Sequence, residues 1–164
     1  MPWKTAIGCM SDKVVLDTSV LVALVDSRDK WHSVAIAISD ALKAERIGLI
    51  YLDPVINETV SVLARRLQEQ RRTESFSGLL DIIEDLAPPE RITWVSAMTQ
   101  RLYPQVIALV REHDGALNFH DAVIALACRE LGFQDIASFD AGFDRLNWLV
   151  RLEKPDDVQT AGRS

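Results

Sequence analysis

A chain of 164 residues is long enough for one domain with a sizeable core, and its 48% hydrophobic and 26% charged residues are typical of a soluble globular protein. No apolar run approaches the length of a membrane span, and residues 1–10 carry one lysine and no long apolar segment, so we expect neither a membrane helix nor a secretory signal. Cys9 and Cys128 have no partners at metal-ligand spacing, and this cysteine usage fits a reducing, cytoplasmic location. The net charge of −6 argues against a protein that coats nucleic acid.

The first predicted elements are a buried strand and a short buried helix. Residues 1–12 lack periodicity and are interpreted as an N-terminal extension. Val14-Val15-Leu16 is a β-branched run typical of a buried parallel strand. Asp17-Thr18-Ser19 carries side chains that favour a helix cap, so we predict a helix over residues 20–25, although strand propensity alone would continue the strand.

The middle of the chain alternates between helix and strand. Residues 31–44 have helical spacing, and residues 47–52 form a second apolar strand. Asp53-Pro54 is typical of a helix start and predicts a helix that ends near residue 72. A further helix is predicted over residues 75–86.

The alternation continues to the end of the chain. The remaining predicted strands are residues 92–95, 134–138 and 148–152, and the remaining helices are residues 97–113 and 118–131. Pro104 is a candidate break within the first of these helices, and Gly132 is expected to end the second. Residues 139–147 are predicted to form a loop with at most one helical turn, and residues 154–164 a C-terminal tail.

Strands that alternate with helices predict a parallel sheet with helices on both faces. We therefore expect an α/β fold, a three-layer doubly wound sandwich around a central, mostly parallel five-stranded sheet. This domain is expected to span residues 13–153.

Four acidic residues stand where the predicted elements meet. Asp17 follows the first strand and Asp140 the fourth, while Glu58 and Asp121 lie in the first turns of helices. In parallel sheets, the carboxyl ends of the strands and the starts of the following helices share one edge, and ligands bind there at the switch in strand order. The order of the elements therefore predicts that all four acids line one crevice.

Each acid taken alone has an ordinary structural explanation. Asp17 can cap a helix, and Asn118 with Asp121 has a spacing that resembles a capping box. Glu58 gains from a helix dipole, and Asp140 is a common turn residue. Together, however, four like charges in one crevice would repel one another strongly.

A divalent cation is the expected compensation for this repulsion. Mg²⁺ and Mn²⁺ take oxygen ligands, and His32, His113 and His120 are too scattered to indicate a zinc site. His120 is interpreted as a surface residue at a helix start rather than a ligand. Leaving out the four acids brings the net charge to −2, so an acidic site does not exclude a local basic patch.

These motifs resemble the PIN-domain ribonucleases, and most closely the VapC-type toxins of VapBC toxin–antitoxin pairs. The resemblance extends from about residue 14 to residue 152 and includes the Asp29-x-x-His32 pair. It is carried by Val14 to Leu24, by the helix that contains Glu58, by Asn118 to Ala125 and by Ala137 to Phe143.

The resemblance implies a role for each member of the acidic set. Asp17, Asp121 and Asp140 would be ligands of Mg²⁺ or Mn²⁺, directly or through water. Glu58 would hold a water molecule or act as a base, and Ser19 would donate its hydroxyl to Asp17 or to the substrate phosphate. The outer shell of the site would hold Asn118 and Asp144, the latter an acid that many relatives do not need.

Candidates for binding the RNA backbone lie on the helix predicted over residues 54–72. They are Arg65, Arg66, Arg71 and Arg72, and a solvated helix face explains them equally well. The resemblance also implies a homodimer and, for a toxin, a cognate antitoxin whose C-terminal segment covers the crevice and places a basic side chain among the acids.

We therefore predict a Mg²⁺- or Mn²⁺-dependent endoribonuclease that hydrolyses RNA phosphodiesters with a metal-activated water. The alternatives are an RNA-processing PIN nuclease without an antitoxin, a catalytically silent PIN-like interaction module, and a phosphatase of the haloacid-dehalogenase type. The intact acid set counts against the silent module. Ser19 stands where such a phosphatase needs a second Asp.

Overall fold

The computed structural model describes residues 12–159. The predicted extension, with Cys9, therefore lies almost entirely outside the described residues. No helix among residues 12–159 is long and apolar enough to cross a membrane.

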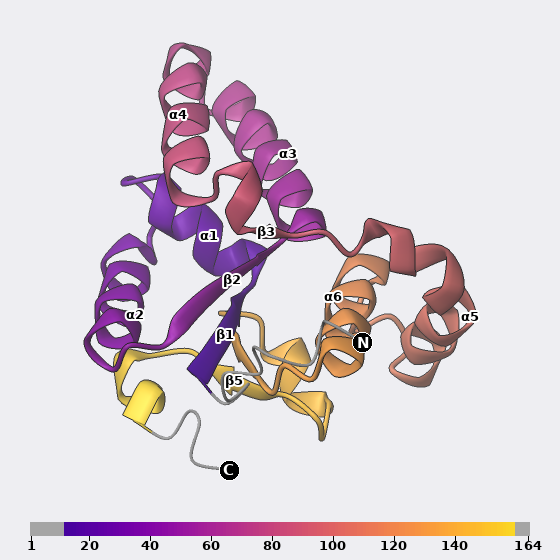
Figure 1. Ribbon diagram of the computed structural model, residues 1–164. Helices are drawn as coiled ribbons and strands as arrows, with labels where there is room; N and C mark the ends of the chain where they lie inside the picture. The colour runs from indigo at the N-terminus through magenta and orange to yellow at the C-terminus, as the bar shows by residue number, and fades with distance from the viewer. Residues whose placement is uncertain (1–11, 160–164) are drawn as a thin grey trace.

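The centre of the molecule is a five-stranded sheet in which every pairing is parallel. The strand order is β3-β2-β1-β4-β5 (Figure 1). The strands are β1 (Lys13–Leu16), β2 (Gly48–Leu52), β3 (Ile92–Thr93), β4 (Asp135–Ala137) and β5 (Val150–Leu152). This confirms the predicted α/β class, and the sheet is wholly parallel rather than mostly so.

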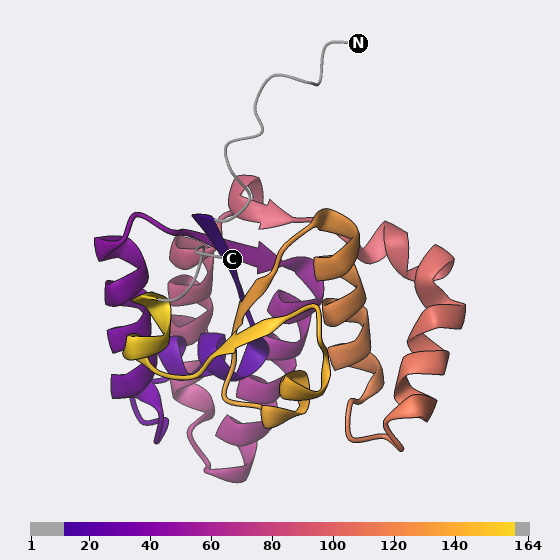
Figure 2. The ribbon, with the colours of Figure 1, turned by 90° about the horizontal axis from the view of Figure 1, so that it is seen from below.

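Helices cover both faces of the sheet, as Figures 1 and 2 show. The chain moves outward from β1 to β2 and β3 and then returns to β4, and right-handed crossovers therefore place the helices before and after the reversal on opposite faces. One face holds α1 (Thr18–Val25), α2 (His32–Ala44), α3 (Asp53–Glu69) and α4 (Phe76–Leu86). The other face holds α5 (Ser96–Glu112) and α6 (Phe119–Leu131).

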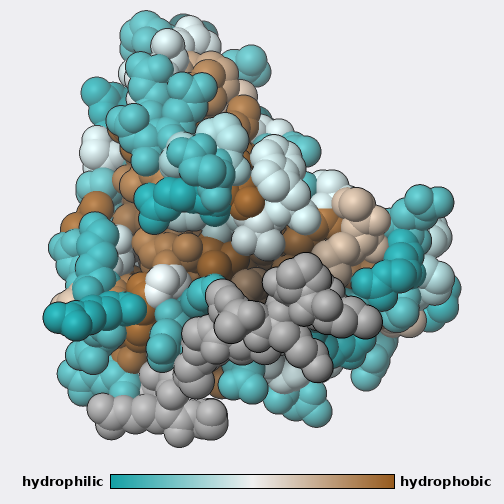
Figure 3. Space-filling model, in the orientation of Figure 1, coloured by the Kyte–Doolittle hydropathy of each residue, from teal (hydrophilic) through white to brown (hydrophobic). Residues whose placement is uncertain are grey.

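The core is built around β1 and α1. Val14, Val15 and Leu16 of β1 are buried on both sides, and most of α1 is buried between α2 and α3. Burial explains why the β-branched run of α1 is helical: Asp17 caps the helix, and its apolar side chains pack on every side. Hydrophilic side chains cover the outer ends of α4 and α5, and apolar ones gather between them over the sheet (Figure 3).

Pro104 and the C-terminal tail are among the predicted features that differ from the structure. Pro104 does not break α5, because it lies on the exposed side of the helix, where water can bond the carbonyl it leaves free, and buried Leu102 and Val106 hold the helix in place. The predicted tail includes a 3-10 helix, Pro155–Gln159, whose Val158 is buried and which packs against α2. The remaining 3-10 helices are Thr73–Ser75, Pro89–Arg91 and Ala141–Arg145.

We predict that Gly132 stabilises the end of α6 through its backbone conformation. Its φ angle is 77°, a left-handed value that costs little only in glycine. Gly132→Ala should lower the free energy of unfolding by about 1 kcal/mol and the Tm by roughly 2–4 °C, measured by thermal unfolding. Gly78→Ala is the matched control: Gly78 lies inside α4 with open space around it, so alanine should raise stability by roughly 0.5–1 kcal/mol. Equal stability of Gly132→Ala and the parent protein would contradict this assignment.

Candidate active site

A pocket opens at the carboxyl edge of the sheet, at the switch point where the chain leaves β1 and β4 in opposite directions. Its volume is about 220 Å³. All four predicted acids line it: Asp17, Glu58, Asp121 and Asp140. Ser19 and Asn118 also contribute to its wall. The parallel topology therefore brings together acids that are far apart in the sequence.

Asp17 is the most constrained of these acids. It caps α1, is only 4% exposed, and its Oδ2 accepts hydrogen bonds from the hydroxyls of Ser19 and Ser138, each at 2.7 Å. Burial raises the pKa of this carboxyl, and the hydroxyl donors partly offset that effect. The backbone N–H of Ser19 donates to the same oxygen at 3.3 Å, so both serines orient the carboxylate through Oδ2.

Asp121 reaches the pocket from the start of α6. The predicted capping box is present: Asp121 N–H donates to Asn118 Oδ1 at 2.9 Å, and Asn118 N–H donates to Asp121 Oδ2 at 3.2 Å. Burial raises the pKa of Asp121 to about 7, and the charges of Asp17, Asp140 and Glu58 add to the shift. The four acids therefore face one another closely enough to repel.

Glu58, on the second turn of α3, has two neighbours that the sequence did not indicate. Thr18 donates its hydroxyl to Glu58 Oε2 at 2.7 Å. His120 Nε2 is buried 3.1 Å from the same oxygen, an ion-pair distance without the alignment of a hydrogen bond. His120 is thus a partly buried neighbour of Glu58 rather than the surface residue that we predicted.

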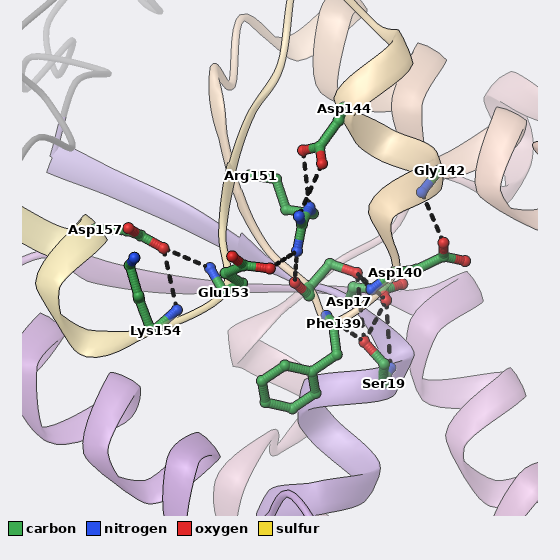
Figure 4. Close-up of polar contacts among 11 residues, drawn as sticks. Asp17, Ser19, Phe139, Asp140, Gly142, Asp144, Arg151, Glu153, Lys154 and Asp157 are labelled. Carbon is green, nitrogen blue, oxygen red and sulfur yellow. Dashed lines mark hydrogen bonds and ion pairs between the residues drawn. The ribbon is translucent and has the colours of Figure 1, made fainter.

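Asp140 lies on the exposed rim of the pocket, in the turn after β4. Its backbone N–H donates to Ser138 Oγ at 3.0 Å, and its Oδ1 accepts from Gly142 N–H at 2.7 Å (Figure 4). Ser138 therefore contacts both Asp17 and Asp140. It was missed because its role depends on a hydrogen bond between β4 and β1; the only available signal was its place in the Ser138-Phe139-Asp140 run.

Asp144 points away from the pocket and pairs with Arg151 instead (Figure 4). Both oxygens of the carboxylate accept from the guanidinium at 2.8 Å, and these bonds hold the pKa of Asp144 below its usual value. Arg151 also donates to Ser138 O at 3.2 Å and to Glu153 Oε2 at 2.7 Å. Asp144 thus lies outside the pocket and pairs with the arginine that bonds the carbonyl of Ser138, just after β4.

The four predicted arginines separate into two pairs. Arg65 and Arg66 line the pocket, and Arg66 Nη1 also pairs with Asp29 Oδ2 at 2.6 Å. Arg71 and Arg72 lie outside it, because α3 ends at Glu69 rather than near residue 72. Arg71 is exposed with a left-handed φ of 53°, and Arg72 pairs with Asp26 at 3.5 Å.

The donor set fits a hard divalent cation that keeps part of its water shell. The pocket offers carboxylate oxygens, and a bound cation would reduce the repulsion between them. Among residues 12–159, no three His, Cys, Asp or Glu side chains are already close enough to hold a metal ion.

Comparison with known proteins places this geometry in a family. Residues 14–149 match the PIN domain family. Among solved structures, VapC20 of Mycobacterium tuberculosis, described as a toxin that cleaves the sarcin-ricin loop, superposes with a TM-score of 0.62 at 23% sequence identity. The match covers 83% of this chain and 96% of that one. No curated protein matches the sequence.

We predict that Asp121 makes the metal-free protein less stable as the pH rises. Its folded pKa of about 7 lies above the ordinary value of 3.8, so between these values the folded state binds a proton that the unfolded state has lost. The free energy of unfolding should therefore fall between pH 4 and 7, by on the order of 2–4 kcal/mol from this group, and nearer the lower end because the pocket is open to water.

The measurement is denaturant unfolding in EDTA across this pH range, for the parent protein and Asp121→Asn. Asparagine cannot ionise, so the difference in stability between the two proteins should shift toward the variant as the pH rises. A difference that stays constant from pH 4 to 8 would contradict the raised pKa.

Proposed function

This chain belongs to the PIN domain family, and we propose that it is a Mg²⁺- or Mn²⁺-dependent endoribonuclease, the toxin of a type II toxin–antitoxin pair. One observation carries the proposal: four carboxylates from four elements line one pocket. The structural similarity to VapC20, described as a toxin that cleaves the sarcin-ricin loop, supports RNA as the substrate.

In this proposal, Asp17, Asp121 and Asp140 hold the cation, with Asp17 oriented by Ser19 and Ser138. When bound, the ion supplies the positive charge that polarises a phosphodiester and lowers the pKa of water. The hydroxyl of Ser19 is used by Asp17, which favours an orienting role over a phosphate contact.

Glu58 is the candidate base. The hydroxyl of Thr18 fixes its orientation, and His120 lies 3.1 Å from the same carboxylate oxygen. Glu58 would take a proton from the attacking water as the new P–O bond forms and the bond to the leaving sugar oxygen breaks. The leaving oxygen then receives a proton from solvent.

The proposed function also predicts the partners of the protein. We propose a homodimer, supported by Tyr103 and Phe119, which are both exposed and lie with ring centroids 6.3 Å apart. A cognate antitoxin would inhibit by placing a basic side chain among the pocket acids. We place the activity in the cytoplasm, where RNA substrates are found.

We predict that Asp17→Asn abolishes cleavage. Loss of the most constrained carboxylate should lower metal-dependent cleavage of total RNA by at least roughly 100-fold, measured with Mg²⁺ and with Mn²⁺. Asp81→Asn is the control, because Asp81 is an exposed acid of α4 outside the pocket. Unchanged cleavage by Asp17→Asn, or cleavage by the parent protein at full rate in EDTA, would refute the proposed site.

We predict that Arg65 contacts an RNA phosphate and that Arg71 does not. Arg65 lines the pocket, whereas Arg71 is exposed outside it. Binding of a single-stranded RNA, measured in EDTA at several salt concentrations, should be weaker for Arg65→Gln, and the slope of log K against log[salt] should fall by about 0.7. Arg71→Gln should leave both quantities unchanged. Equal effects of the two substitutions would indicate a general charge effect.

A further inference from the structure

A second cavity lies beside the acidic pocket, on the other side of the turn that follows β4. Its volume is about 340 Å³, within the range of small-ligand sites. The lining residues are Trp31, Val34, Phe139, Glu153 and Lys154. It therefore combines an aromatic wall with charged side chains of both signs.

The aromatic wall is a stacked pair. The rings of Trp31, at the start of α2, and Phe139 have centroids 5.0 Å apart and an interplanar angle of 19°. The pair is not simply buried packing, because Trp31 remains 43% exposed. Lys30 Nζ lies 5.4 Å from the centroid of the Trp31 ring, which places a positive charge beside the exposed part of the pair.

The wall is tied directly to the acidic pocket. Phe139 stands between Ser138 and Asp140, and consecutive Cα atoms are only about 3.8 Å apart. Phe139 N–H donates to Ser19 Oγ at 3.0 Å, and Ser19 in turn orients Asp17. Figure 4 shows the Phe139 ring pointing away from the acids, toward the side of Lys154. The two sites are thus adjacent, but they face opposite sides of one turn.

The position of the cavity beside the acidic pocket, its flat aromatic wall and its lysines together indicate which ligand it binds. A phosphodiester in the acidic pocket would place the next nucleotide within reach of this turn, and aromatic rings bind unpaired bases by stacking without regard to sequence. Lys30 and Lys154 supply positive charge for the phosphates of that nucleotide, on a protein whose net charge is −6.

We propose that this cavity is a nucleobase subsite, in which an unpaired base next to the cleaved phosphodiester stacks against the Trp31–Phe139 pair. The inference rests on the proposed ribonuclease function and makes it more specific: the substrate is RNA that is single-stranded at the cleavage site. A duplex cannot place a base there without unstacking it.

The test uses a short single-stranded RNA with one mapped cleavage site and a series of copies in which one nucleotide near that site is abasic. With the parent protein, the abasic residue should raise KM about tenfold at one position and have little effect elsewhere. Trp31→Leu keeps an apolar side chain but removes the ring. It should raise KM on the intact RNA about tenfold and show no further increase on the sensitive abasic copy, because both changes remove the same contact.

Two control variants accompany Trp31→Leu. Trp31→Phe retains a ring and should stay near the parent KM. Trp94→Leu removes a tryptophan that is 68% exposed elsewhere and should not change KM. Thermal unfolding shows whether each variant is folded, and the abasic series on the parent protein can overturn the subsite even if Trp31→Leu is not.

The possible outcomes separate the two proposals. The subsite would be overturned if cleavage by the parent protein is insensitive to every abasic position. It would also be overturned if the effects of Trp31→Leu and of the abasic residue on KM multiply. Either result would leave the ribonuclease function standing. Absence of metal-dependent cleavage by the parent protein would overturn both.

Discussion

The buried carboxylate of Asp17 is the constraint on which the rest of the site depends. A carboxylate that is 4% exposed is costly unless it is hydrogen-bonded, and its donors come from two places: Ser19 on α1 and Ser138 after β4. The same two hydroxyls accept from the backbone of Phe139 and Asp140. The hydroxyls that stabilise the buried charge of Asp17 therefore also hold the backbone of the turn that carries Asp140.

Two arginines near the site form ion pairs with acids that lie outside the pocket. Arg151 is paired with Asp144 and Glu153, and Arg66, although it lines the pocket, is paired with Asp29. The pocket acids consequently keep their mutual repulsion, which adds to the effect of burial in raising the pKa of Asp121. We infer that the fold leaves these carboxylates for a cation to neutralise, and that without the cation they weaken the binding of an anionic phosphodiester.

The elements and the four acids could be predicted because they depend on local pattern and on the geometry common to all parallel sheets. Ser138, Thr18 and His120 could not, because their roles depend on which side chains meet across β4, α1, α3 and α6. We predicted that α3 extends to about Arg72, but it ends at Glu69, before Arg71 and Arg72. Helix propensity does not determine the last residues of a helix. The partner of Asp144 is seven residues away on β5, a contact that becomes visible only when the strand order is known.

The turn from Ser138 to Asp140 links the chemistry of the pocket to the choice of substrate. One face presents a carboxylate to the acidic pocket, the other presents an aromatic ring to the neighbouring cavity, and hydrogen bonds to Ser138 and Ser19 hold the backbone between them. A turn held in this way cannot move the acid without moving the ring. If a base and a phosphate are bound on its two faces, their separation is therefore set by the protein, and an RNA that cannot adopt that separation is rejected before the bond is broken.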